Sequence, residues 1–461
     1  MSLPHQLLQF ISDPTGGKVV LVIGAGTSVE PPTNLPLSGD MSAEVYRRLV
    51  EDGIITNGCE NPRNLSLVAD IVYEIMGEQI EVVKRMNRQK LKKALPNRGH
   101  HLASALLIEG AISDILTLNY DLAICHGLAD LSSGDNIALI EGPEDHIELG
   151  PKNIIFLHRS ANKDPEDWIL RSDLLDEEWK DEWESVITNR ILSSPAIIFV
   201  GLGSPAASLT ETVNKIREAI PESTNIFYVS PANPKRSGFF KQLNTDGSAA
   251  IELGWSDFME KLSDRLLSEQ KNSLLEACSK LCNEFDLSEP NYETICEEIT
   301  EQGLLKVGKT RASWLLHNQN YAPSNNHNDL WLADLLLAIS LIVRIGDCQI
   351  EFKQNGLIEF TSDNGEETLL YFMHGKSIFA ISTIEDQISN NRTLWNRNGE
   401  SPKAVLISGV EQHANQNIAS PRDITGNYKP NDIIEGKNDI DIIPINDLRS
   451  NQRLVMELFN E

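Results

Sequence analysis

Residues Leu21–Ser28 read LVIGAGTS, and this stretch is the most informative feature of the chain. Four apolar residues, Val19–Val22, lead into a Gly-Ala-Gly turn that opens a polar segment. A buried parallel strand ends in this way at a phosphate-binding turn, because glycine permits a sharp bend and lets backbone N–H groups approach a phosphate. We therefore expect five residues to contact a phosphate-bearing ligand: Gly24, Ala25, Gly26, Thr27 and Ser28.

The turn is shorter than the complete dinucleotide-binding fingerprint. That fingerprint has a third glycine, and this chain has Val29 at that position. A plain tight turn in an α/β protein is the alternative interpretation of the same residues.

Composition limits the class of protein. The chain has 461 residues, enough for two or three domains, and a net charge of −27. Such a charge argues against a broad nucleic-acid-binding face, although it leaves room for a local basic patch. The N-terminal stretch is too short and too polar for a secretion signal, and the six cysteines are scattered, so we expect a cytoplasmic protein with no membrane span.

Short apolar stretches alternate with helical patterns over the first 270 residues. Five strands are predicted, at 18–24, 112–121, 152–160, 195–204 and 224–234. Apolar residues at three- and four-residue spacing predict a helical insertion over 40–95. Strands that alternate with helices indicate an α/β fold with a doubly wound, Rossmann-like parallel sheet.

Small or polar residues follow each predicted strand. Because open parallel sheets bind ligands at the carboxyl ends of their strands, we expect these residues to gather at one edge. Loop residues selected for turn chemistry are the alternative. Besides the GAGTS turn, the candidates are Asn119, Asp121, His158, Gly201, Gly203, Ser204 and Asn233.

The ordered set GAGTS, PNRGHHLA, TLNYD, LHRS, FVGLGS and IELGWSDFMEKL resembles the sirtuin (silent information regulator) family, over residues 1 to about 270. It is most similar to the sirtuin-like domains of bacterial antiphage defence. The resemblance implies an NAD⁺ hydrolase that releases nicotinamide and ADP-ribose, with NAD as substrate and no metal. It implies catalytic roles for Asn119, Asp121 and His158. The residues it implies for NAD binding are Gly24, Ala25, Gly26, Thr27, Ser28, Asn119, Gly201, Gly203, Ser204 and Asn233.

Three departures from the family pattern keep other functions open. Arg159 follows His158 where the family has glycine, the paired Cys-x-x-Cys zinc module is missing, and VEPPTNLPLSGDM has no arginine to match the family's segment. One alternative is an NAD-dependent protein deacylase, against which the missing zinc module counts. The other is a non-catalytic module that binds NAD or ADP-ribose, which Arg159 favours.

Residues 271–461 carry no catalytic pattern, and we expect an α+β interaction or sensing domain there. The run Leu330–Ile345 predicts a buried helix, alternation around an Asp-Gly turn predicts hairpins, and 403–409 predicts another strand. Cys278, Cys282 and Cys296 are predicted as thiols of a helical core, and the acidic run 173–184 as a solvated helix. The resemblance further implies a homo-oligomer and a defence partner, such as a HerA-type ATPase or a short Argonaute.

Overall fold

A computed structural model describes residues 3–12, 19–56, 58–131, 137–171, 192–203, 207–219, 225–243, 249–284, 292–314, 330–353, 356–374, 381–408 and 440–459. The chain divides into two compact units, Met1–Leu266 and Leu267–Glu461. The acidic run 173–184, predicted as a solvated helix, lies outside the described residues.

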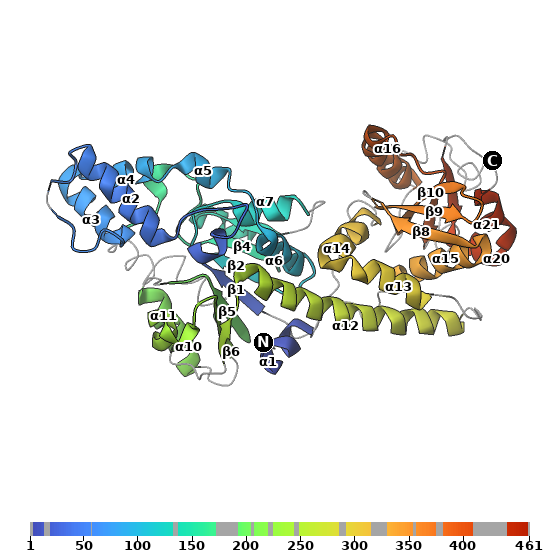
Figure 1. Cartoon of the computed structure of the whole chain (residues 1–461), viewed down its shortest axis with the longest axis horizontal. Coiled ribbons are helices and arrows are strands. Elements are labelled where there is room, and N and C mark those ends of the chain that lie inside the picture. Colours follow the sequence, from blue (N-terminus) through green and yellow to red (C-terminus); the bar gives the residue numbers. More distant parts are fainter. Residues whose placement is uncertain are drawn as a thin grey trace. The chain divides into compact units, whose positions relative to one another are not determined.

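The first unit is built on a seven-stranded sheet with the order β3-β4-β2-β1-β5-β6-β7. Every neighbouring pair is parallel, and β1 lies between β2 and β5 (Figure 1). The chain therefore builds outward from β1 in both directions, which confirms the predicted doubly wound sheet. The strands are β1 Val19–Ile23, β2 Asp114–Thr117, β3 Ala138–Ile140, β4 Asn153–Phe156, β5 Ala196–Val200, β6 Asn225–Ser230 and β7 Ala250–Glu252.

Two of these strands were not predicted. β3 and β7 form the two edges of the sheet and contain three residues each. Each has only one fully buried residue, so neither carries the continuous apolar run that marks the inner strands. β1, β2, β4 and β5 are buried at every position, as expected of parallel strands covered on both faces.

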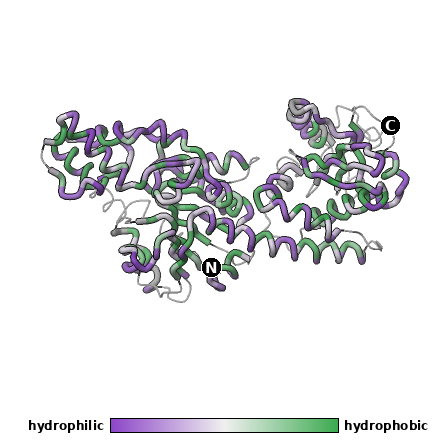
Figure 2. The backbone as a smooth tube through the Cα atoms, viewed as in Figure 1, coloured by the Kyte–Doolittle hydropathy of each residue, from purple (hydrophilic) through white to green (hydrophobic). Residues whose placement is uncertain are grey.

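The predicted insertion forms four helices: α2 Ser38–Glu51, α3 Leu65–Met76, α4 Ile80–Arg85 and α5 Arg88–Lys92. The Asn64 side chain accepts hydrogen bonds from the first turn of α3, and Gly77 ends that helix in the left-handed conformation. The apolar pattern of the insertion is therefore interrupted at Gly77, between α3 and α4. Figure 2 shows hydrophobic colour along the central strands and mixed colour along these helices.

The remaining elements of the first unit connect the strands. They are α1 His5–Ser12, η1 Ala25–Ser28, α6 Arg98–Ile108, α7 Ala123–Ala129, η2 Pro143–Glu148, η3 Pro165–Asp167, α10 Ala207–Ala219, η4 Pro234–Arg236 and α11 Gly238–Gln242. Helix α12, Trp255–Glu284, begins in the first unit and ends in the second. The predicted boundary at residue 270 falls inside this helix.

The second unit contains a five-stranded sheet with the order β12-β11-β10-β9-β8. β8, β9 and β10 pair antiparallel, whereas β11 and β12 add in parallel, which confirms the predicted α+β class. The hairpins and the buried helix α15 lie where the sequence predicted them. The elements are α13 Tyr292–Glu301, α14 Gly303–Trp314, α15 Leu330–Gly346, β8 Cys348–Phe352, β9 Leu357–Ser362, β10 Glu367–His374, α16 Ile381–Asn398, β11 Ala404–Ser408, β12 Asp441–Pro444, α20 Ile445–Ser450 and α21 Gln452–Phe459.

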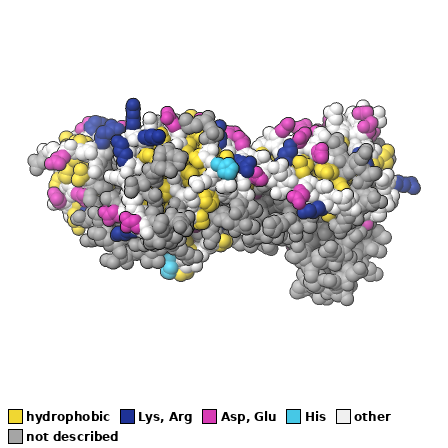
Figure 3. All heavy atoms as spheres, turned by 90° about the horizontal axis from the view of Figure 1, so that it is seen from below, with side chains coloured by type: hydrophobic (Ala, Val, Ile, Leu, Met, Phe, Trp, Pro, Cys, Tyr) yellow, Lys and Arg dark blue, Asp and Glu magenta, His cyan; other side chains and the backbone are white. Residues whose placement is uncertain are grey.

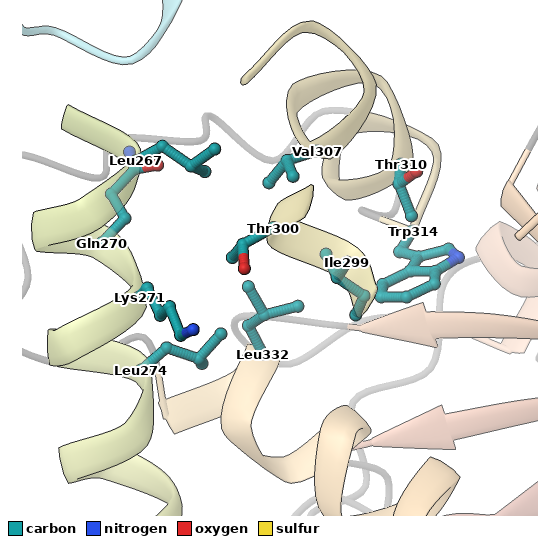
Figure 4. A pocket seen from close by; sticks show the side chains of 10 residues that line it. All are labelled: Leu267, Gln270, Lys271, Leu274, Ile299, Thr300, Val307, Thr310, Trp314 and Leu332. Atoms are coloured by element: carbon teal, nitrogen blue, oxygen red, sulfur yellow. The ribbon is translucent and has the colours of Figure 1, made fainter. Parts of the chain in front are cut away.

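The second unit encloses a small apolar cavity among α12, α13, α14 and α15. Figure 4 shows Leu274, Ile299 and Leu332 extending into it from three of these helices. Its volume of about 20 Å³ is the room that one water molecule needs, so it cannot hold a dinucleotide. In the described part of the chain, no helix combines the length and the apolar character needed to cross a bilayer.

Candidate active site

The glycine turn after β1 packs directly against the loop after β5. Gly24 N–H donates to the Val200 carbonyl at 3.0 Å, and Gly26 N–H donates to the Gly201 carbonyl at 2.9 Å. A Cβ atom on Gly26 would lie 2.7 Å from the Gly201 Cα atom, and Gly201 itself has φ +70°. The close approach of two backbones therefore accounts for these glycines, and the N–H groups of Gly24 and Gly26 donate within the protein.

Asn119 fastens the glycine turn to the loop after β2. Its side-chain nitrogen donates to the Gly24 carbonyl at 3.1 Å and lies 3.3 Å from the Ser28 hydroxyl. The residue is only 7% exposed. Asn119 therefore connects two strand ends through buried hydrogen bonds, and it is also a candidate ligand contact.

Asp121 provides a second connection between the same loops. One carboxylate oxygen accepts from Ser28 Oγ at 2.9 Å, and the other accepts from the Ala123 N–H at 3.1 Å, at the start of α7. Burial raises the pKa of Asp121, whereas these two hydrogen bonds act in the opposite direction.

His158 follows β4, the strand next to β2. Its Nε2 atom is shielded from solvent and has no hydrogen-bond partner in the described structure. Burial lowers the pKa of His158 to about 4, the Arg159 charge adds to this, and a hydrogen bond with the Leu118 backbone opposes it. The imidazole is therefore neutral near pH 7 and free to accept a proton, which is the form that a general base requires.

An aromatic stack supports the histidine. The Tyr120 ring lies parallel to the Trp168 indole at 4.5 Å, and its centroid is 6.2 Å from that of His158. The Tyr120 hydroxyl donates to the Ile169 carbonyl at 2.9 Å. Neither aromatic residue is predicted from the sequence as part of the site, because the loop after β2 and the segment containing Trp168 come together only in the folded chain.

Arg159 occupies a glycine-like position. Its φ is +72°, in the left-handed region that residues other than glycine adopt at a cost in free energy. The residue is 8% exposed. The positive charge lies close enough to His158 to disfavour a second positive charge on the imidazole. The departure from the family pattern thus falls where the backbone conformation itself favours glycine.

A buried network at the start of α6 holds the other side of the glycine turn. Asn97 donates to the Thr27 carbonyl at 2.8 Å and accepts from the Trp255 indole at 3.1 Å. The Glu30 carboxylate accepts from the backbone N–H of Trp255 at 2.9 Å. Both residues belong to motifs quoted from the sequence, PNRGHHLA and IELGWSDFMEKL, but residue spacing does not predict their contact across 158 residues.

Not every predicted site residue joins this cluster. Gly203 is exposed with open space around its Cα, and Ser204 lies outside the described residues. Asn233 is exposed and caps η4 by accepting from the Lys235 N–H at 3.1 Å. Within the described ranges, no three His, Cys, Asp or Glu side chains are arranged to hold a metal ion.

No protein-family model and no curated protein matches this chain. Among solved structures, it is similar to a Sir2 homologue in complex with NAD, at 17% identity and a TM-score of 0.33, over 59% of this chain and 95% of the other. It is also similar to Sir2 in complex with a p53 peptide and NAD⁺, at 13% identity and a TM-score of 0.32, over 56% of this chain and 97% of the other. The fold class assigned above depends on the strand order and register of this chain and not on these likenesses.

Proposed function

We propose that the first unit binds NAD⁺ at the carboxyl edge of its sheet and hydrolyses the bond between nicotinamide and ribose. The observation that supports this best is the buried, unpartnered Nε2 atom of His158. A buried polar atom without a partner is costly, so a native structure retains one where a ligand or a water molecule satisfies it. The neutral imidazole follows β4, next to the end of β2, and the loop after β2 carries both Asn119 and Asp121.

The proposed reaction needs a base more than an acid. A water molecule attacks the C1′ carbon of the ribose, and the electrons of the breaking C–N bond neutralise the positive nicotinamide ring, which leaves without needing a proton. His158 takes the proton that the attacking water loses. The side-chain oxygen of Asn119 orients that water or a ribose hydroxyl, because its nitrogen is already committed to the Gly24 carbonyl.

The proposed role of Asp121 is to hold the site together and to favour the positive charge that develops on the sugar. Its two oxygens are bonded to Ser28 and to Ala123, so its position is fixed before substrate arrives. The pyrophosphate is assigned to the turn Ala25–Ser28, with Gly201, Gly203, Ser204 and Asn233 as further proposed contacts.

Arg159 also supports a second candidate, a module that binds NAD or ADP-ribose without cleaving it. A cation next to the base opposes both the imidazolium and the positively charged transition state. Both candidates bind NAD, but only the hydrolase releases nicotinamide and ADP-ribose.

One experiment separates these candidates from the deacylase. The protein is incubated with NAD⁺, with and without an acetylated peptide, and nicotinamide, ADP-ribose and acetyl-ADP-ribose are followed by chromatography. Nicotinamide and ADP-ribose in equal amounts without peptide support the hydrolase, whereas nicotinamide release that requires peptide supports the deacylase. Binding of NAD⁺ by calorimetry without any product supports the module.

The proposal includes the wider role that the family resemblance implies. In this role the protein is a regulated NAD-depleting effector of bacterial antiphage defence. It acts as a homo-oligomer or with a defence partner such as a HerA-type ATPase or a short Argonaute. A hydrolase of this kind must be held at a low rate until it is triggered, so we expect cells that express the protein to lose NAD⁺ much faster after phage infection than before it. Unchanged NAD⁺ in infected cells would contradict this role and leave the site chemistry untouched.

A further inference from the structure

An unusually basic segment lies in this acidic protein. Residues 84–98 contain seven Lys and Arg and no Asp or Glu, although the whole chain has a net charge of −27. Three of the seven pair with carboxylates: Lys84 and Arg85 with Glu81, and Arg98 with Glu260. In the described structure no carboxylate forms an ion pair with the other four, which we call the cationic rim: Arg88, Lys90, Lys92 and Lys93.

Two residues of the cationic rim, Arg88 and Lys90, donate hydrogen bonds to loops that border the candidate site. The Arg88 guanidinium donates to the carbonyls of Ala161 and Lys163, in the loop after His158. The Lys90 ammonium donates to the Asn34 carbonyl at 3.0 Å, in the loop that follows Ser28. Figure 3 shows Lys and Arg side chains gathered over the end of the first unit that carries the insertion helices. Lys93 is exposed, and Lys92 is partly exposed.

A surface of the opposite charge lies in the second unit. Residues 284–301 contain seven Asp and Glu and no Lys or Arg. Helix α13 buries Ile295, Cys296 and Ile299 against its own unit and exposes its glutamates. Glu297 pairs with Lys271 at 3.0 Å, whereas no cation among the described residues pairs with the three other glutamates of the helix, Glu293, Glu298 and Glu301. The neighbouring Glu301 contributes to a raised pKa of Glu298, after burial, so the helix carries unrelieved negative charge.

We infer that the occupant of the cationic rim is α13 of a second copy of this chain. Each copy has one surface of each sign, so a second copy supplies the acidic helix that complements the cationic rim of the first. Exposed ion pairs are weak singly, and several together give an association that is fast, selective and sensitive to salt. The inference names the surfaces of the oligomer in the proposed function, yet its test does not depend on NAD⁺ cleavage.

The test is sedimentation of the full chain, whose mass is 51.3 kDa, at about 50 mM and about 500 mM salt. The wild type is expected to approach twice the monomer mass at low salt and the monomer mass at high salt. Lys92→Glu with Lys93→Glu is expected to remain monomeric, and so is Glu293→Lys with Glu301→Lys. A matched control, Lys235→Glu with Lys241→Glu, makes the same charge change at exposed residues elsewhere on the first unit and is expected to associate as the wild type does.

Mixing the two reversed variants is the decisive experiment. The acidic rim of the Lys92→Glu, Lys93→Glu variant then faces the basic α13 of the Glu293→Lys, Glu301→Lys variant, so opposite charges meet again. The mixture is expected to reach the pair mass at low salt. A monomeric wild type under all conditions, reversed variants that associate normally, or a mixture that stays monomeric would each overturn the inference. Binding of a DNA duplex by the monomer through Lys92 and Lys93 would assign the rim to nucleic acid instead and would also overturn it.

Discussion

The Ser28 hydroxyl donates to the Asp121 carboxylate at 2.9 Å, and this buried contact joins the loop after β1 to the loop after β2. Asp121 is 93 residues from Ser28 in the chain and lies on a neighbouring strand end. Asn119 bridges the same two loops through the Gly24 carbonyl. Two of the three proposed catalytic residues therefore also hold the site's architecture, so their substitution should affect stability as well as chemistry.

Asp121→Ala should destabilise the first unit by about 1–3 kcal/mol, because Ser28 Oγ and the Ala123 N–H would both lose their acceptor in a buried site. Urea unfolding measures the difference. The control is Asp130→Ala, which removes an exposed carboxylate paired with His101 and should change stability by about 0.5 kcal/mol or less. Equal stability of the two variants would show that the Asp121 contacts contribute little.

His158→Gln should abolish nicotinamide release while NAD⁺ still binds. A base acts mainly in the transition state, so turnover should fall by about 10²-fold or more, with a much smaller change in affinity. The matched control is His126→Gln. His126 lies in α7, and its Nδ1 atom contacts the Ala94 carbonyl. Loss of NAD⁺ binding in calorimetry would make His158 a ligand contact and not the base.

The pH dependence of turnover should reflect the lowered pKa of His158. Because this pKa is about 4, the base remains neutral through pH 6, and activity should fall only as the pH approaches 4. The same shift links to stability: a histidine whose folded pKa lies below its unfolded value of 6.5 stabilises the fold fully above pH 6.5, and this contribution is lost as the pH falls towards 4. An acid limb centred near pH 6.5 in the kcat/KM profile would contradict the buried, neutral histidine.

Arg159→Gly and Arg159→Ala separate backbone strain from charge. Both remove the guanidinium, and only glycine relieves the positive φ, so the glycine variant should be more stable than the alanine variant by about 1 kcal/mol. Both should cleave NAD⁺ faster than the wild type if the cation restrains the site. Denaturant titration and initial rates measure the two effects. If the wild type is active and neither variant is faster, Arg159 does not restrain the site. The hydrolase proposal would still stand.

Local pattern was sufficient to predict the inner part of the first sheet. β1 and β5 are continuous apolar runs that end in glycine, and burial on both faces leaves such runs few alternatives. The edge strands escaped prediction because three residues with one buried position carry almost no periodic signal. The insertion was predicted as helical, and Gly77 explains why its second apolar stretch forms two helices.

The candidate site was only partly accessible to sequence reasoning. Strand-end positions identified Asn119, Asp121 and His158, because topology alone places neighbouring strand ends together. The partners that fix these residues were not predictable: Trp168 stacks on Tyr120 from a segment after β4, and Trp255 reaches Asn97 from the start of α12. Such contacts depend on how the loops pack, for which residue spacing carries no information.

A chromatographic time course of NAD⁺ with the wild type and with His158→Gln decides whether His158 drives NAD⁺ hydrolysis. The wild type is expected to release nicotinamide and ADP-ribose in a one-to-one ratio without any peptide, and the folded variant is expected to bind NAD⁺ but to release neither. Equal rates of nicotinamide release by the two proteins would contradict the proposed role of His158.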